Sequence, residues 1–213
     1  MGKAINLFLA VLAISAAAHG QQFEGKITYQ NTYKSKIPNL TDKQFSAMLG
    51  TRQEYFIKGG NYKSLTNGTV AKWQLYINAD NRIYNKSSNS RTISWDDAST
   101  DDDPVISAEL KKDAMLVLGR KCDELILKCR NGTEIYYFDP NLGVDMTLYK
   151  NHKYGNWYEY LKHAHALPLK MIFNKKLFSM ESVATQVQEM KLDDKEFQLP
   201  QNVKIEKSSH RSF

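Results

Sequence analysis

The residues of this chain that could bind a metal ion are a few histidines and one run of aspartates. His163 and His165, with His152 upstream, form the one group of histidines close in sequence. In an extended segment His163 and His165 would project to one face, but no third ligand has a suitable spacing for a transition metal. The stretch from Asp96 to Asp103 holds five aspartates, yet their spacing does not match a calcium-binding loop. We therefore expect surface histidines, a solvated and exposed acidic loop, and no metal or other cofactor.

Motifs for covalent catalysis or phosphate binding are also missing from the sequence. There is no Gly-x-Ser-x-Gly elbow, and neither cysteine lies in a protease signature. Gly59-Gly60 lacks the rest of a glycine-rich phosphate loop. A triad assembled from distant residues would leave no such motif, so an enzyme stays open as an alternative. The sequence favours a protein that is not an enzyme.

Cys122 and Cys129 raise the question of a disulfide bond. Both fall in one expected strand, where a rise of about 3.3 Å per residue would separate them by about 23 Å. A disulfide allows a Cα separation of about 7 Å at most. A turn near Glu124-Leu125 would make the bond possible, and two separate thiols are the favoured alternative.

Aromatic side chains are the most prominent candidates for binding a ligand, with twelve tyrosines, nine phenylalanines and three tryptophans. Many lie in expected strands, where aromatic residues are common as ordinary sheet packing. If the sheet is curved, some of them face a concavity that could hold an apolar ligand. The candidates for lining it are Tyr29, Tyr55, Trp73, Tyr76, Trp95, Tyr136 and Phe138.

The elements that would position these side chains are mostly short strands. Alternating apolar and polar residues predict a first strand over Phe23 to Tyr33. Later runs alternate with turn residues such as Asn67-Gly68 and Asn131-Gly132, which are typical of hairpins in an antiparallel meander. Further strands are expected at Ala114 to Leu118, at Asp123 to Lys128, at 133–138, at Met171 to Phe173 and at Met180 to Gln188.

Two short helices interrupt the strands. Thr41 and Gln44 have the spacing of a capping box, which predicts a helix that runs to Leu49 and ends at Gly50. A second helix is expected from Gly155 to His163, because Trp157, Tyr160 and Leu161 share one face. We expect Pro168 to end this helix.

The first residues of the chain predict export. Lys3 precedes an apolar run from Leu7 to Ala18, and Ala18-His19-Gly20 provides the small residues of a cleavage site. We therefore divide the chain into a signal peptide (1–20), one domain (21–207) and a polar tail (208–213), and expect a periplasmic or secreted protein. No second apolar run predicts a membrane span. The net charge of +6 is spread along the chain, so no nucleic acid partner is expected.

Several segments follow one another in an order that resembles a known family. They are Gly119 to Cys122, the strand pair around Asn131-Gly132, Tyr154 to Tyr158, Ala166 to Lys170 and Asp194 to Pro200. The order resembles a family of uncharacterised exported bacterial domains that is similar in fold to the LolA/LolB-like lipoprotein-localisation factors. The resemblance covers Phe23 to Lys204 in layout. It implies an open barrel with a helical lid and a hydrophobic cavity for acyl chains, but the basic residue that releases the cargo has no match here.

The expected fold is therefore α+β, a strongly curved and mainly antiparallel sheet that forms an open half-barrel with two short helices. The expected function is an exported, non-enzymatic envelope protein that binds a hydrophobic ligand, a lipid or the acyl chain of a lipoprotein, in the concavity. The alternative is a structural or protein-interaction module of the cell envelope that binds another envelope protein and no small ligand.

Overall fold

The structure is a computed structural model that describes residues 22–209; the expected signal peptide lies outside this range, as do residues 210–213 of the expected tail. It contains one twelve-stranded sheet in the order β12-β6-β5-β4-β3-β2-β1-β11-β10-β9-β8-β7. The strands are β1 (Gly25–Ser35), β2 (Arg52–Lys58), β3 (Asn61–Thr66), β4 (Ala71–Ile77), β5 (Arg82–Ser87), β6 (Ile93–Asp97), β7 (Val105–Val117), β8 (Arg120–Cys129), β9 (Gly132–Gly143), β10 (Ala166–Lys175), β11 (Phe178–Glu189) and β12 (Ile205–Lys207).

The helices are short and lie against this sheet. They are α1 (Asp42–Leu49), α2 (Trp157–Ala164) and three 3-10 turns, η1 (Met146–Tyr149), η2 (Tyr154–Asn156) and η3 (Asp194–Phe197). Within residues 22–209, no helix is long and apolar enough to cross a membrane.

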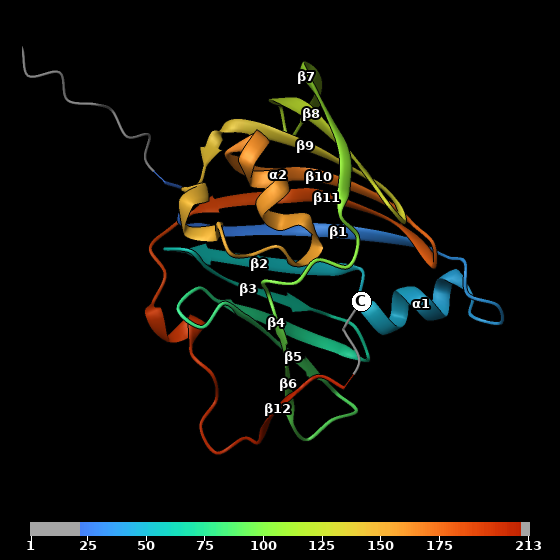
Figure 1. The fold of residues 1–213 in the computed structure, drawn as a ribbon, viewed down its shortest axis with the longest axis vertical. Coiled ribbons are helices and arrows are strands. Elements are labelled where there is room, and N and C mark those ends of the chain that lie inside the picture. The colour runs from blue at the N-terminus through green and yellow to red at the C-terminus, as the bar shows by residue number, and fades with distance from the viewer. Residues whose placement is uncertain (1–21, 210–213) are drawn as a thin grey trace, which may run out of the picture.

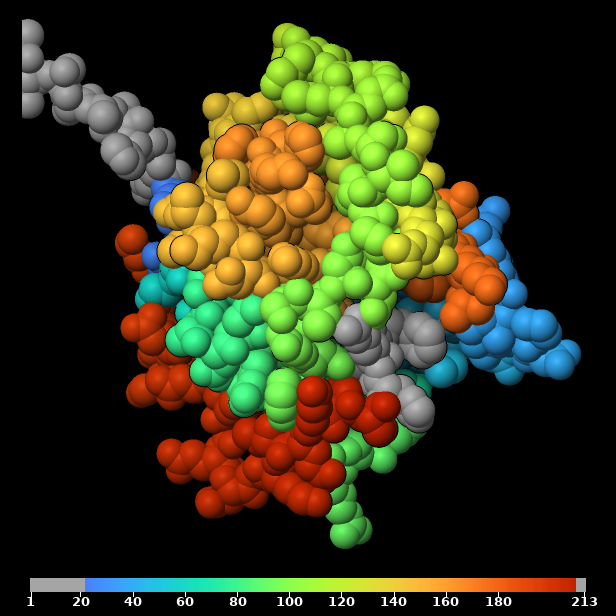
Figure 2. All heavy atoms as spheres, viewed as in Figure 1, coloured from blue at the N-terminus to red at the C-terminus, as the bar shows by residue number. Residues whose placement is uncertain are grey.

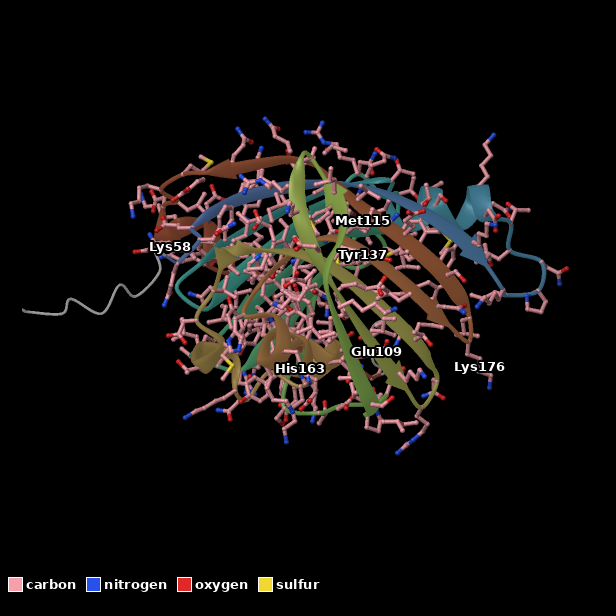
Figure 3. The ribbon with its side chains drawn as sticks, turned by 90° about the horizontal axis from the view of Figure 1, so that it is seen from above. Lys58, Glu109, Met115, Tyr137, His163 and Lys176 are labelled. Atoms are coloured by element: carbon pink, nitrogen blue, oxygen red, sulfur yellow. The ribbon has the colours of Figure 1, made fainter. Side chains whose placement is uncertain are left out.

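The sheet curls around α2 without closing. Its strand pairs are antiparallel except for β12, which runs parallel to β6. Figures 1 and 3 show α2 on the concave side and α1 at one end of the strands. The predicted fold class, a curved antiparallel sheet with two α-helices, is confirmed.

The first strand and the first helix form where local sequence predicts them. Thr41 Oγ1 accepts a hydrogen bond from the Gln44 backbone N–H at 3.2 Å, and Gln44 Oε1 accepts one from the Thr41 N–H at 3.0 Å. This capping box satisfies two N–H groups that the first helical turn leaves unpaired. The helix ends at Gly50, whose φ of 94° favours glycine. Phe45 then anchors α1 by packing against Tyr33 and Phe178.

Removing this cap should have a measurable cost. We expect Thr41→Ala to lower the free energy of unfolding by about 1 kcal/mol, because the Gln44 N–H loses its acceptor. Urea denaturation followed by circular dichroism would measure the loss. An unchanged midpoint would contradict the role of the cap.

Two expectations about the second half of the chain need correction. Pro168 does not end a helix, because α2 stops at Ala164 and Pro168 lies inside β10, where the register with β9 shifts on both sides of it. Such a bulge accommodates a residue without an N–H group. The strand expected from Ala114 begins at Val105 instead. As an edge strand, β7 is largely exposed, with charged residues from Glu109 to Asp113 in its middle, so it lacks the regular alternation of a half-buried strand.

The sheet packs on both faces. The larger buried cluster fills the concave side between the sheet and α2, and it includes Ile27, Leu125, Tyr136, Tyr160 and Leu161. A smaller cluster covers the outer face of β4, β5 and β6, where Leu75, Tyr84 and Ile93 pack against Leu192 and Phe197. The segment after β11 therefore provides the outer cover.

Candidate functional site

A cavity of about 750 Å³ lies on the part of the concave face that α2 does not fill. Its floor is made by strands from β1 to β6 and from β9 to β11, and its walls come from the β6–β7 loop, η2 and the end of α1. The β6–β7 loop crosses in front of the sheet below α2 (Figure 1). In Figure 2, α2 with its neighbouring loops (yellow to orange) and β7 with the preceding loop (light green) cover the concave side.

One side of the cavity is apolar. Tyr33 and Met180 are paired residues of β1 and β11, and Phe173 of β10 pairs with Met180. All three point to the concave face, and Phe178 and Leu49 extend the same surface. These side chains are only partly buried, so they present apolar area to the cavity.

The floor of the cavity is a polar row that crosses six adjacent strands. Side chains on an inward face normally form the core, so amides and hydroxyls there indicate a surface kept for binding. We call these residues the amide row. Its members, from β1 to β6, are Asn31, Gln53, Ser64, Gln74, Asn85 and Ser94.

Register and hydrogen bonds hold the amide row in place. Ser64 pairs with Gln74 and Gln74 with Asn85. Gln74 Nε2 donates to Asn85 Oδ1 at 3.0 Å, and Gln53 Nε2 donates to Ser64 Oγ at 2.8 Å. Asn31 Nδ2 donates to Gln53 Oε1 at 3.4 Å. The amides are therefore ordered before any ligand arrives, which lowers the entropic cost of binding.

A buried charged cluster closes the other end of the cavity. Lys175 Nζ lies 2.6 Å from Asp103 Oδ2 and 2.5 Å from Glu134 Oε1. Asn156 Nδ2 donates to Glu134 Oε1 at 3.2 Å and to the Asp103 carbonyl at 3.1 Å. We call these residues the charged cluster: Asp103, Glu134, Asn156 and Lys175.

The charges in this cluster stabilise each other. Burial alone would lower the pKa of Lys175, but attraction by Glu134 and hydrogen bonds to both carboxylates outweigh it, so the pKa is raised. Burial would raise the pKa of Asp103, but hydrogen bonds from Lys175 and the Asn131 N–H hold it below its usual value. Lys175 therefore remains protonated and Asp103 ionised at neutral pH.

One set of potential metal ligands belongs to the same region. Within residues 22–209, the group whose ligand atoms converge is Asp103, Cys129 and Glu134, all within 4.8 Å of one another. The Lys175 ammonium, however, lies against both carboxylates. Burial raises the pKa of Cys129 to about 12, so the thiol is protonated. As arranged, the residues form an ion pair and do not fit a metal ion.

The aspartate stretch is less exposed than the sequence leads us to expect. Asp96 belongs to β6, is only 5% exposed and accepts a hydrogen bond from Asn85 Nδ2 at 3.0 Å. Ala98 is also buried, and its carbonyl accepts hydrogen bonds from the Lys153 and Tyr154 N–H groups. The expectation of an exposed loop over the whole stretch is therefore wrong. Its C-terminal half is a cavity wall held to η2.

The histidines are not brought together. His163 and His165 are exposed at the end of α2, and Figure 3 labels the first of them. His152 is buried, with its Nε2 atom 2.9 Å from the Tyr62 hydroxyl and its ring between tyrosines. Burial lowers the pKa of His152 to about 3, so its ring is neutral. Against the expectation that all three lie at the surface, His152 is part of the core.

Cys122 and Cys129 are separate buried thiols, which agrees with the favoured sequence interpretation. They lie on one continuous strand, β8, with no turn between them.

The aromatic candidates lie in three places. Tyr29, Tyr76, Tyr136 and Phe138 belong to the buried concave core, where Tyr55 packs beside them. Trp73 contributes to the cavity lining and also packs on the outer cluster. Trp95 packs on the outer cluster with Arg82 Cζ 3.9 Å from its ring centroid. The aromatic residues of the cavity lining include Tyr33, Tyr154, Phe173 and Phe178.

Neither the amide row nor the charged cluster was predicted from the sequence. The row had a signal, because Ser64 and Gln74 each lie two residues from a tyrosine on the same face of an alternating strand, and Asn85 pairs with Gln74. The charged cluster had none, because Asp103, Glu134 and Lys175 lie in distant segments that meet only through the sheet.

Neither a protein-family model nor a curated protein matches the sequence. Solved structures with a similar fold include PNGF-II, with a TM-score of 0.49 and 16% identity over 87% of this chain and 32% of the other. This chain therefore spans about a third of the length of PNGF-II.

Two similar structures span nearly the whole length of their own chains. The LolA superfamily protein NE2245 from Nitrosomonas europaea has a TM-score of 0.41 and 10% identity, over 84% of this chain and 91% of that one. LprF from Mycobacterium bovis has a TM-score of 0.34 and 10% identity, over 80% of this chain and 88% of that one. A LolA superfamily protein, the kind of protein that the sequence resembles, is thus among these structures.

Proposed function

We propose that this chain is an exported, non-enzymatic envelope protein that binds an amphiphile in the concave cavity. The observation that carries the proposal is the lining, in which an apolar side and a polar row face the same space. A volume of about 750 Å³ lies within the range of small-ligand sites, which is about 300 to 1,000 Å³. The apolar side would hold an acyl or alkyl chain, and the amide row would hold the head group.

The chemistry of the cavity lining also supports binding over catalysis. Most of the polar residues in this lining carry neutral amides or hydroxyls, and several of these are hydrogen-bonded to one another. The ionisable pair Lys175 and Glu134 is locked in a short ion pair. The raised pKa of Lys175 keeps its ammonium protonated at neutral pH, so it cannot act as a general base there. Export rests on the apolar segment within residues 1–20.

Photoaffinity labelling tests this proposal. A dodecyl chain that bears a terminal diazirine would be attached in turn to a maltoside and to a phosphocholine head group. We expect at least one of the two probes to label peptides that contain Phe173, Phe178 or Met180. Labelling confined to the outer face, or none with either probe, would overturn the proposal.

Blocking the apolar side should reduce binding. We expect Met180→Trp to weaken the affinity for a dodecyl amphiphile by about tenfold or more, because the larger ring occupies the space beside Tyr33 and Phe173. Isothermal titration calorimetry would measure it. The matched control is Thr185→Trp, which adds the same ring at an exposed position of β11. Equal affinities for Met180→Trp and the wild type would contradict this use of the cavity.

A protein-interaction module is a second candidate, favoured by one observation on β7. Ile106 is 74% exposed and Leu116 is 65% exposed on this edge strand, where an incoming strand could pair. Cross-linking in cells should then capture one dominant envelope protein, and Ile106→Ser should reduce the capture. Unchanged capture by the variant would exclude β7 as the contact.

A further inference from the structure

The polar lining of the cavity restricts which head group the amphiphile can have. This inference rests on the proposed function. The amide row offers both donors and acceptors. Gln, Asn and Ser side chains each carry at least one of each kind. A head group that only donates, or only accepts, leaves part of the row unsatisfied.

Two buried oxygen atoms beside the cavity lack a partner. Asn31 Oδ1 and Asn156 Oδ1 have no hydrogen-bond partner among residues 22–209, although both residues are only 1% exposed and both line the cavity. An unsatisfied buried acceptor is costly, so a donor from a ligand would be favourable at either position. Asn156 cannot gain by exchanging its oxygen and nitrogen, because its Nδ2 atom already donates to Glu134.

The charge of the lining excludes one class of head group. Four carboxylates line the cavity (Asp101, Asp102, Asp103 and Glu134) against two lysines, so the formal charge of the lining is −2. Both lysines are engaged, since Lys175 bridges two carboxylates and Lys86 donates to the Ser90 carbonyl. The cavity is therefore negative in a chain of net charge +6, and it repels phosphate, sulfate and carboxylate groups.

A hydroxyl group satisfies all of these conditions. It donates to the carboxylates and to the two unpartnered amide oxygens, and it accepts from the amide N–H groups of the row. A quaternary ammonium group has the favourable charge, but it offers no hydrogen bond to the row. We propose that the cavity selects an amphiphile with a neutral, hydroxyl-rich head group of the kind that a sugar provides.

Calorimetric titration with matched dodecyl amphiphiles, below their critical micelle concentrations, tests the selection. The probes are dodecyl maltoside, dodecyl phosphate and dodecyl trimethylammonium, with maltose alone as the ligand without a chain. We expect the maltoside to bind at least about tenfold more tightly than either charged probe, because several hydrogen bonds distinguish them. Equal or tighter binding of a charged probe would overturn the selection and leave the proposed function intact.

Variants distinguish the contribution of the head group to binding from that of the dodecyl tail. Gln74→Ala should weaken the affinity for dodecyl maltoside by about fivefold or more. The affinity for dodecyl trimethylammonium should change by less than about twofold. Gln186→Ala, at an exposed position of β11 outside the cavity lining, is the matched control. A Gln74→Ala protein with unchanged preference would contradict the role of the row. If maltose binds as tightly as the maltoside, the apolar tail contributes nothing, and the proposal that the ligand is an amphiphile is overturned. If none of the probes binds, both the selection and the proposed function are overturned.

Discussion

Replacing Lys175 with methionine should lower the free energy of unfolding by about 3 kcal/mol at neutral pH. The Lys175 ammonium contacts Asp103 at 2.6 Å and Glu134 at 2.5 Å, and the Glu134 side chain is only 4% exposed. Without the ammonium, the two carboxylates repel each other in a desolvated site, or one of them takes up a proton at neutral pH. Either outcome destabilises the folded state. Guanidinium denaturation of the two proteins would measure the difference.

The neighbouring residue is the control for this variant. Lys176 is exposed at the turn between β10 and β11, at the edge of the molecule in Figure 3. Lys176→Met removes the same charge and should change the free energy of unfolding by less than about 0.5 kcal/mol. Similar losses in the two variants would show that the ion pairs of Lys175 do not stabilise the fold.

Acid should destabilise the protein through His152. Burial lowers the pKa of this imidazole to about 3 in the folded state, against 6.5 as its ordinary value. Between these values the unfolded chain binds a proton that the folded chain does not, so stability falls as the pH falls below 6.5. The contribution of this one group from pH 7 to pH 4 is about 3 kcal/mol. Denaturation curves recorded across this range would show the decline.

Two variants isolate this contribution from the titration of carboxylates. In His152→Phe a ring is kept against Tyr62 and Tyr76 but no longer takes up a proton, so the decline between pH 7 and pH 4 should shrink by about 3 kcal/mol. His163→Phe, at an exposed position of α2, should leave the decline as in the wild type. The same pH dependence in His152→Phe and the wild type would contradict the burial of a neutral imidazole.

Local signals in the sequence predicted the elements that depend on neighbouring residues. The capping box that begins at Thr41 marks the start of α1, and Gly50 marks its end. The apolar spacing of Trp157, Tyr160 and Leu161 places α2 within two residues of its observed start. Both patterns act through hydrogen bonds or contacts within one or two helical turns. That is why they can be recognised without the fold.

The features that depend on tertiary contacts were less accessible. Asp96 is polar, but Asn85 on the adjacent strand provides the hydrogen bond that allows its burial. The strand aromatics could not be divided between core and cavity, because the position of α2 decides which part of the concave face is filled. Tyr136 packs against Tyr160 of α2, with ring centroids 4.3 Å apart, whereas Phe173 lies beyond that cover and lines the cavity.

The polar floor is the feature that connects fold and function. A curved sheet can fill its concavity with apolar side chains, as this one does beneath α2. From Ser64 to Ser94, four successive strands instead place amides and hydroxyls on the same face. Such a row contributes little to folding, since its polar groups gain only modest net energy from one another. We infer that binding accounts for it.

Native mass spectrometry of the protein purified from its own host tests the central proposal most directly. We expect a complex of one protein chain with one amphiphile, and extraction should release a molecule with an apolar tail and a neutral, hydroxyl-rich head group. Met180→Trp, purified in the same way, should carry much less of it. Recovery of the free chain alone, from a host that contains such lipids, would contradict the proposal that the concave cavity is a binding site.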